Sequence, residues 1–239
     1  MPIATIIYTL WVRFLFAVIL LLTLIPMGIL VFLVPQRYRY NKLFFLASAL
    51  LYKAIVRAAC LPIRIKGKRN VPKAPAIFVA NHSSSLDIPL LGSLIGMHSH
   101  VWLAMSWLTN FFAFRYFLPR TAVLVDMSSP QKGVRSLIKT INLVKEHAMH
   151  VMIFPEGRRY TDGNVHDFYG GFAILAKKTG LPVVPVRIYN LEKVYPPENF
   201  WMHRHPVNVV IGEAMHMRED ESDQEFKERV HEWFLQQDA

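Results

Sequence analysis

The sequence predicts an α/β fold, a single domain with a mostly parallel or mixed central sheet of about seven strands flanked by helices. From residue 63 onward, short apolar runs alternate with helical stretches. Several runs are almost continuously apolar, as expected of strands that are buried on both faces of a helix-covered sheet. A long apolar N-terminus predicts a membrane-associated two-helix segment before this domain. We therefore divide the chain into N-terminal membrane-anchoring helices, residues 1–60, and a globular domain, residues 61–239.

The first apolar run is long enough to cross a membrane as a helix. Residues 14–34 carry no charge, and Pro26 would kink the helix without ending it. A cleaved signal peptide is the alternative interpretation. The run is too long for the apolar region of such a peptide, however, and no convincing small-residue cleavage site follows it. We expect the protein to retain this segment as a membrane element.

A second helix is predicted after a basic break at residues 35–42. In residues 43–62, Lys53 and Arg57 lie four positions apart among apolar residues. This spacing is typical of an amphipathic helix that lies in the membrane interface. A helix packed on the globular core is the alternative.

Positive charge is concentrated in this N-terminal part of the chain. The net charge is +10, yet residues 1–86 contain no Asp or Glu, and Asp87 is the first acidic residue. Basic residues beside an apolar span are attracted to anionic lipid and favour the cytoplasmic side of a membrane. We do not expect nucleic-acid binding, because no recognised nucleic-acid module accompanies the charge. Cys60, the single cysteine, allows no intramolecular disulfide, and we expect it to be a buried thiol.

The elements of the globular domain follow from apolar runs and from helix start and stop signals. We expect helices over Pro130–His147, over Gly171–Thr179 and from a capping box at Ser222 and Glu225 onward. The predicted strands are residues 63–67, 76–80, 101–105, 122–126, 150–154, 183–189 and 207–212.

Two predicted strands end in clusters of polar residues, which is where ligands bind in open α/β sheets. The first cluster is NHSSSLD, in which Ser83 or Ser84 would cap a helix that begins near Ser85. That turn would bring the Asp87 carboxylate to the His82 imidazole, fix its tautomer and raise the basicity of its other nitrogen. Taken alone, a histidine at a strand end is more often structural.

The second cluster is FPEGRR, residues 154–159. Gly157 lets the backbone approach a ligand closely, and the guanidinium groups of Arg158 and Arg159 suit a phosphate. Glu156 can orient an arginine or accept a hydrogen bond from a substrate hydroxyl. A charged surface turn is the alternative interpretation.

The two clusters and a later strand together resemble the lysophospholipid acyltransferase family, whose best-known members are 1-acylglycerol-3-phosphate acyltransferases. The resemblance covers about residues 63–212. Its first block, N-H-x4-D, matches Asn81, His82 and Asp87. Its third matches Phe154, Pro155, Glu156, Gly157 and Arg158 or Arg159, and its fourth matches Val184, Pro185 and Val186.

The chain departs from the family pattern at two places. Asp126 is kept in the second block, but Met127 stands where family members have a phosphate-binding arginine. Arg158 follows Gly157 directly, a variant similar to the acyltransferase part of bacterial lysophospholipid-recycling enzymes. The resemblance therefore leaves the head group open, with Lys132 or Arg135 as further candidates for phosphate binding.

The resemblance implies that His82, oriented by Asp87, acts as general base on the free hydroxyl of a lysophospholipid. The implied substrate is 1-acyl-sn-glycerol-3-phosphate, and the product is phosphatidic acid. Asn81 and residues 154–159 would bind substrate. The acyl donor would be acyl-CoA or acyl-carrier protein, without a metal or other cofactor. We expect a bacterial-type inner-membrane enzyme whose catalytic domain faces the cytoplasm.

Two other functions are compatible with the sequence. A serine hydrolase would use Ser83, Ser84 or Ser85 as nucleophile, although the G-x-S-x-G motif is missing. A non-catalytic lipid-binding or scaffold protein would keep the fold but would be expected to lose His82 or Asp87, and both are present.

Overall fold

The computed structural model describes residues 2–33 and 41–237, with the side chains of residues 24, 30 and 113 excepted. Most of the predicted basic break at residues 35–42 therefore lies outside the described residues. The described chain forms one seven-stranded sheet in the order β1-β7-β6-β2-β5-β3-β4. The strands are β1 Ile63–Lys66, β2 Ile77–Ala80, β3 His100–Met105, β4 Ala122–Val125, β5 His150–Ile153, β6 Val183–Tyr189 and β7 Val207–Ile211.

The sheet is mostly parallel, as predicted. Strands β6, β2, β5, β3 and β4 run in one direction. Strand β7 is antiparallel to β6, and β1 is parallel to β7. Every residue of β2 and β6 is buried, in keeping with their apolar composition and their central position. The carboxyl ends of β2 and β5 consequently meet at one edge of the sheet.

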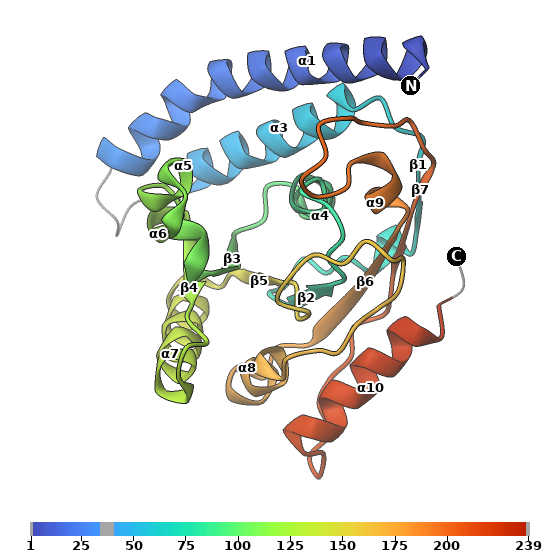
Figure 1. Cartoon of the computed structure of the whole chain (residues 1–239). Coiled ribbons are helices and arrows are strands. Elements are labelled where there is room, and N and C mark those ends of the chain that lie inside the picture. The colour runs from blue at the N-terminus through green and yellow to red at the C-terminus, as the bar shows by residue number, and fades with distance from the viewer. Residues whose placement is uncertain (1, 34–40, 238–239) are drawn as a thin grey trace.

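Helices cover both faces of the sheet (Figure 1). Ile77 and Val79 of β2 belong to an apolar cluster shared with α7 (Pro130–His147), α8 (Gly171–Thr179) and α10 (Asp223–Leu235). Phe78 and Ala80 point to the other face, into a cluster shared with α4 (Asp87–Ile95) and α9 (Leu191–Val194). The alternation along β2 thus places one apolar core on each face, as period-two strand geometry requires.

Helix α1 spans Ile3–Gly28 and continues into a π-helical turn, η1, at Ile29–Leu33. Among the described residues it is the one helix long and apolar enough to cross a membrane, and the qualifying part is Ile3–Thr23 rather than the predicted residues 14–34. Pro26 lies inside the helix and does not end it.

One side of α1 packs on the rest of the protein. Thr9 exchanges hydrogen bonds with the backbone of Met202, and the Arg13 guanidinium donates to the Phe200 carbonyl oxygen at 2.6 Å. Near the other end, Met27 and Val31 are buried in the apolar core. Because the contacts extend along most of the helix, α1 lies lengthwise on the protein and beside α3 (Figure 1).

Helix α3, Lys42–Ala58, has features of both predicted arrangements, a helix packed on the globular core and an amphipathic helix in the membrane interface. The Asn41 side chain caps its first turn, and Phe44 and Phe45 are buried in the core. Leu43, Leu46 and Leu50 are exposed large apolar residues. The helix therefore packs on the core along one face and exposes apolar side chains along another. Its polar residues Lys53 and Arg57 are exposed, as predicted.

Three features differ from the sequence predictions. Helix α4 begins at Asp87 rather than near Ser85, because Ser83 and Ser84 form the turn that donates to the Asp87 carboxylate. Cys60 is exposed, so the prediction of a buried thiol is wrong. Short helices that no sequence signal predicted fill the connection between β3 and β4. These are η3 Ser106–Asn110, α5 Phe112–Arg115 and α6 Leu118–Thr121, and a further short helix, η2 Lys68–Asn70, follows β1.

Candidate active site

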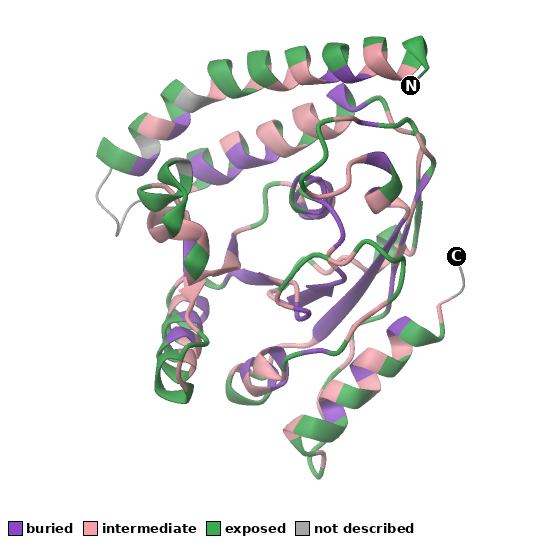
Figure 2. Cartoon of the chain, in the orientation of Figure 1, coloured by how far each residue is buried: buried purple, intermediate pink, exposed green. Residues whose placement is uncertain are grey.

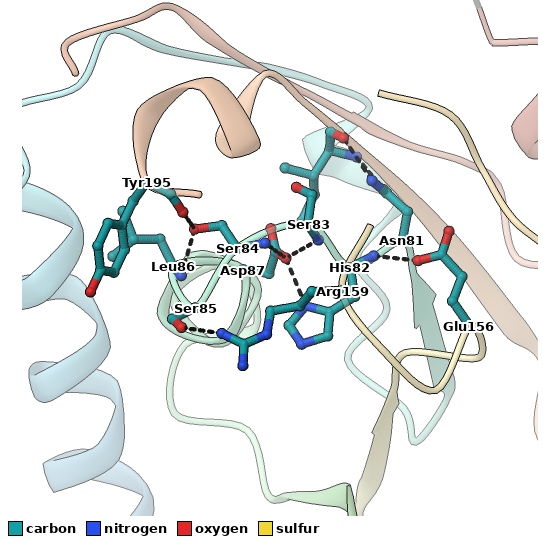
Figure 3. A network of polar contacts seen from close by, with 11 residues as sticks. Asn81, His82, Ser83, Ser84, Ser85, Leu86, Asp87, Glu156, Arg159 and Tyr195 are labelled. Atoms are coloured by element: carbon teal, nitrogen blue, oxygen red, sulfur yellow. Dashed lines mark hydrogen bonds and ion pairs between the residues drawn. The ribbon is translucent and has the colours of Figure 1, made fainter. Parts of the chain in front are cut away.

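The two polar clusters meet at the carboxyl ends of the neighbouring strands β2 and β5 (Figure 3). The backbone N–H of His82 donates to Glu156 Oε2 at 2.8 Å, which joins the turn after β2 to the turn after β5. The Tyr160 N–H donates in return to the His82 carbonyl oxygen at 2.9 Å. The parallel pairing of β2 with β5 thus brings together residues that are 74 positions apart.

His82 and Asp87 form a hydrogen-bonded dyad. His82 Nδ1 lies 2.7 Å from Asp87 Oδ2, and the same oxygen accepts the backbone N–H groups of Ser83 and Ser84 at 2.7 and 2.8 Å. Asp87 is fully buried and is the first residue of α4, where backbone N–H groups and the helix dipole favour a carboxylate. A carboxylate on Nδ1 places the proton there and leaves Nε2 as the basic nitrogen.

The imidazole is also held by an aromatic stack. The His82 ring lies on Phe154 with 4.0 Å between ring centroids and 11° between planes. Phe154 in turn stacks on Trp102 of β3 at 5.8 Å. Because the His82 side chain is 16% exposed, its ring is fixed by packing yet remains reachable by a substrate. Phe154, predicted to bind substrate, thus supports the imidazole directly.

The three serines between the dyad residues have other partners. Ser84 Oγ donates to the Tyr195 carbonyl oxygen at 2.7 Å, and Ser85 Oγ accepts from the Arg159 guanidinium at 2.7 Å. Ser83 Oγ is buried, with no hydrogen-bond partner in the described part of the chain. No hydroxyl among the described residues hydrogen-bonds to His82, so the arrangement lacks the nucleophile–base contact of a serine hydrolase.

Asn81 ties the turn after β2 to β6. Its side-chain amide donates to the Ile188 carbonyl oxygen at 2.9 Å, and its Oδ1 accepts the Ile188 N–H at 2.7 Å. The side chain is buried, and both of its polar groups are occupied by this backbone contact. The geometry therefore favours a positioning role for Asn81, next to His82, over the predicted contact with substrate.

Glu156 is a buried clamp rather than a surface charge. In addition to His82 N–H, its carboxylate accepts the His166 N–H at 3.1 Å, and it is 3% exposed. Burial raises the pKa of Glu156, and the two backbone donors oppose this rise by stabilising the charged form. The alternative of a solvated surface turn is thus excluded at Glu156, which fixes the FPEGRR turn against the NHSSSLD turn.

Gly157 and the two arginines form the outer part of the site. Gly157 has φ +71°, and a Cβ atom there would lie 2.8 Å from the Tyr169 ring. The turn holds Pro155 buried while it leaves Arg158 and Arg159 exposed. The Arg159 guanidinium contacts Ser85 in the turn that carries the dyad, and the Arg158 guanidinium lies over the Tyr160 ring. Two exposed guanidinium groups in this turn are suited to an anionic substrate group.

Comparison with known proteins identifies the family. The model of the Acyltransferase family matches residues 62–189, which is more than half of the chain. The chain belongs to the Acyltransferase family. The matched part holds both polar clusters and six of the seven strands, β1 to β6.

Individual relatives carry more specific names. The chain is 28% identical over 152 residues to a 1-acyl-sn-glycerol-3-phosphate acyltransferase of Pseudomonas aeruginosa, an alignment that covers 64% of this chain and 58% of that protein. It is 30% identical over 180 residues to a chloroplastic enzyme of the same name from Arabidopsis thaliana, covering 74% and 50%. The chain thus spans between half and three fifths of the length of these two relatives.

A solved structure matches over almost the whole fold. The crystal structure of the 1-acyl-sn-glycerophosphate acyltransferase of Thermotoga maritima superposes with a TM-score of 0.74 at 25% sequence identity. The match covers 98% of this chain and 95% of that one, so it includes the N-terminal helices as well as the sheet.

Strand β4 is followed by Asp126 and Met127, the two residues of the second family block. Hydrogen bonds from Ser128 and Lys132 lower the pKa of Asp126 from 3.8 to about 2. The Lys132 ammonium lies 3.1 Å from the Asp126 carboxylate and also donates to Ser128, so it is paired within the protein. Arg135 and Met127 are exposed. Of the two further phosphate candidates, Lys132 is therefore occupied by Asp126 and Ser128, whereas the exposed Arg135 makes no ion pair with any residue that the structure describes.

Two further residues support this Acyltransferase site and were not singled out from the sequence. Trp102 closes the aromatic stack beneath His82. Arg187, buried in β6, donates to the Gly163 carbonyl oxygen at 2.9 Å and lies close enough to lower the pKa of Glu156. A charged residue inside the apolar strand VVPVRIY was a usable signal for Arg187, because a buried guanidinium requires partners. The described residues contain no cluster of three or more His, Cys, Asp or Glu side chains that could hold a metal ion.

Proposed function

We propose that the protein transfers a fatty acyl group from an acyl thioester to the free hydroxyl of a lysophospholipid, with 1-acyl-sn-glycerol-3-phosphate as acceptor and phosphatidic acid as product. The observation that carries the proposal is the His82–Asp87 dyad at 2.7 Å beside an exposed pair of arginines. The names of the aligned relatives support the same acceptor.

The dyad supports general-base catalysis by His82. Nε2 takes the proton of the acceptor hydroxyl as its oxygen attacks the thioester carbonyl, and Asp87 stabilises the imidazolium that forms. The carbon–sulfur bond then breaks, and the imidazolium returns the proton to the leaving thiolate. The acyl group passes directly between the two substrates, so neither a serine ester nor a prosthetic group is needed.

Arg158 and Arg159 are the proposed site for the acceptor phosphate. Both are exposed, and the Arg159 contact with Ser85 holds one guanidinium beside the turn that carries His82. The thioester donor is acyl-CoA or acyl-carrier protein. Both donors present the same thioester carbon to the acceptor oxygen.

We propose that the N-terminal helices associate with the membrane, with α1 along its surface and the globular domain on the cytoplasmic side. The contacts of α1 with the protein at Thr9, Arg13 and Val31 support this lengthwise arrangement. The opposite side of α1 exposes large apolar residues along its length. Membrane location also places the catalytic domain where lysophospholipids are present.

The test is a panel assay with purified full-length protein. Lysophosphatidic acid and lysolipids with other head groups are each supplied with labelled acyl-CoA or acyl-carrier protein. We expect acylation of lysophosphatidic acid, and a fall of about 10²–10⁴-fold in kcat for His82→Ala, the range typical of a lost general base.

Single Ser83→Ala, Ser84→Ala and Ser85→Ala variants separate acyl transfer from hydrolysis. Acyl transfer through His82 predicts that each keeps much of the activity. Loss of all turnover in one serine variant, together with labelling of the wild type by a fluorophosphonate, would instead establish a serine nucleophile. Acylation of none of the lysolipids would contradict the proposed acceptor class.

A further inference from the structure

A second apolar surface lies outside the N-terminal helices, in the connection between β3 and β4. We call residues 106–121 the aromatic segment; it comprises η3, α5 and α6. Five large aromatic side chains within ten positions are exposed. They are Trp107 (47%), Phe111 (56%), Phe112 (84%), Phe114 (45%) and Tyr116 (53%). Figure 2 shows exposed residues along this part of the chain. A concentration of exposed aromatic residues of this kind marks an interaction surface.

The exposed rings contact one another. Trp107 meets Phe111 at 6.2 Å, Phe111 meets Phe114 at 6.5 Å, and Phe112 meets Tyr116 at 6.3 Å between ring centroids. At the inner side, Phe117 packs against the apolar core. The rings thus form two contacting groups on one short segment that is fixed to the domain, rather than isolated exposed residues.

The charge of the aromatic segment is wholly positive. Arg115 and Arg120 are its charged residues, and it contains no Asp or Glu. Aromatic and basic side chains together are typical of surfaces at the boundary between lipid and water, where rings enter the head-group layer and cations meet anionic lipid.

The aromatic segment is continuous with the apolar side of α1. The Arg120 guanidinium lies 4.8 Å from the ring of Phe32 in η1. Phe32 is 51% exposed and the neighbouring Leu33 is 75% exposed. In Figure 1, α5 and α6 lie beside the end of α1. The exposed apolar side of the membrane-associated helix therefore extends onto the globular domain at this point.

We propose that the aromatic segment is a second membrane contact, which enters the same lipid surface as α1. The N-terminal helices α1 and α3 lie side by side, so their contact with the membrane restrains rotation of the domain about the helix axes only across the width of this pair. A further contact beside the end of α1 widens the support and fixes how the domain sits on the membrane. Because η3 follows the carboxyl end of β3, four residues after Trp102, the fixed orientation also sets the active-site edge relative to the bilayer.

Site-specific quenching tests the contact independently of catalysis. In a Cys60→Ser background, Phe112→Cys carries an environment-sensitive fluorophore. The full-length protein is bound to phosphatidylglycerol–phosphatidylethanolamine vesicles. The matched control is Leu235→Cys, an exposed apolar position (61%) on α10, and α10 lies across the sheet from α5 in Figure 1. We expect a lipid-attached quencher to act on position 112 and aqueous iodide to act on position 235.

The opposite results overturn the proposal. Quenching of position 112 by iodide to the same extent as position 235 would show that the aromatic segment faces water. Protection of position 112 from both quenchers would show that protein, rather than lipid, covers it, and that outcome equally contradicts membrane contact.

A second measurement connects the contact to activity and rests on the proposed function. Phe112→Asp should lower the activity on vesicle-embedded acceptor at least about tenfold, the factor expected when an aromatic side chain loses its apolar surroundings. Activity on the same acceptor in detergent micelles, and activity of Leu235→Asp in both systems, should stay unchanged. An equal loss in micelles would contradict a role through membrane orientation. If the protein acylates no lysolipid at all, the quenching result still decides the contact.

Discussion

Asp87 Oδ2 is the most heavily used acceptor atom of the site, because one oxygen receives the imidazole N–H and two backbone N–H groups. The same atom thus orients the base and closes the turn that begins α4. A carboxylate in this position performs two tasks, and only one of them depends on its charge.

The variant Asp87→Asn separates these two tasks. An amide oxygen can still accept from Ser83 and Ser84, but it stabilises an imidazolium much less than a carboxylate does. We expect kcat to fall about 10²–10³-fold with little change in KM or thermal midpoint. Steady-state kinetics and thermal unfolding check this. Unchanged kcat would show that the charge of Asp87 plays no part in turnover.

Gly157 is required for two reasons, and Gly163 offers a matched comparison. Both have positive φ, +71° and +80°, but a Cβ atom at Gly163 would meet nothing within 4 Å, whereas one at Gly157 would meet the Tyr169 ring. Gly163→Ala should therefore cost only backbone strain, about 1 kcal/mol, and keep activity. Gly157→Ala should destabilise more and also lower kcat/KM. Chemical denaturation and kinetics of the two variants, measured side by side, check the difference. Equal effects would mean that the Tyr169 contact is unimportant.

At the scale of elements, the starts of β3 and β5 carry a pair of buried histidines at the edge of the sheet opposite the dyad. His100 is 4% and His150 2% exposed, and they face each other in the paired register of the two strands. Burial lowers the pKa of each from 6.5 to about 4. Both are therefore neutral in the folded protein at pH 7.

These two histidines predict a loss of stability in acid. Between pH 6.5 and 4 they bind protons in the unfolded chain but not in the folded one. The free energy of unfolding therefore has its full value, as far as these two histidines are concerned, above pH 6.5, and it declines as the pH falls toward 4. The decline is on the order of 1 kcal/mol per pH unit for each histidine.

Replacement of both histidines by asparagine provides the control. Asparagine can keep the hydrogen bonds that the Nδ1 atoms make, His100 with the His98 carbonyl oxygen and His150 with the Ala76 N–H, but it does not titrate. Thermal midpoints measured from pH 7 to pH 5 should fall less in His100→Asn/His150→Asn than in the wild type. A parallel decline in the two proteins would assign the acid sensitivity to other groups.

At the scale of the whole molecule, α1 and α3 are part of the folded structure as well as the proposed membrane contact. Phe44, Phe45, Met27 and Val31 contribute to the same core cluster as the central strands. Removal of residues 1–60 would therefore disturb the core together with the membrane contact. Substitutions on the exposed side of α1 test the membrane contact without that complication.

Leu22→Asp/Ile25→Asp is the variant of choice, because both side chains are 69% exposed. Two charges on the lipid-facing side of the helix should shift the protein from the membrane fraction toward the soluble fraction, since a carboxylate in lipid is costly. Folding should be unaffected. Membrane sedimentation and thermal unfolding check both points, with Leu235→Asp on α10 as the control. If the variant stays in the membrane fraction as fully as Leu235→Asp, another surface anchors the protein.

The sequence predicted the strands well because their apolar runs are short and bounded by polar or turn residues. All seven begin and end within one residue of the predicted positions. It predicted the N-terminal apolar helix less well, because apolar composition cannot show that α1 begins at Ile3. Nor can it show that Thr9 and Arg13 hydrogen-bond to the globular domain. Nor could it show the aromatic segment, because an aromatic residue type alone does not say whether the side chain is buried or exposed.

By itself, then, the sequence determined the α/β class, the basic and apolar N-terminus, and the His82–Asp87 pair, because these depend on residue type and on short spacings. The tertiary structure alone decided that Glu156 and Asn81 have buried positioning contacts, that Trp102 supports the His82 ring through Phe154, and that the aromatic segment adjoins α1. Each of these joins residues far apart in the chain, and such contacts are set by the order and direction of the strands.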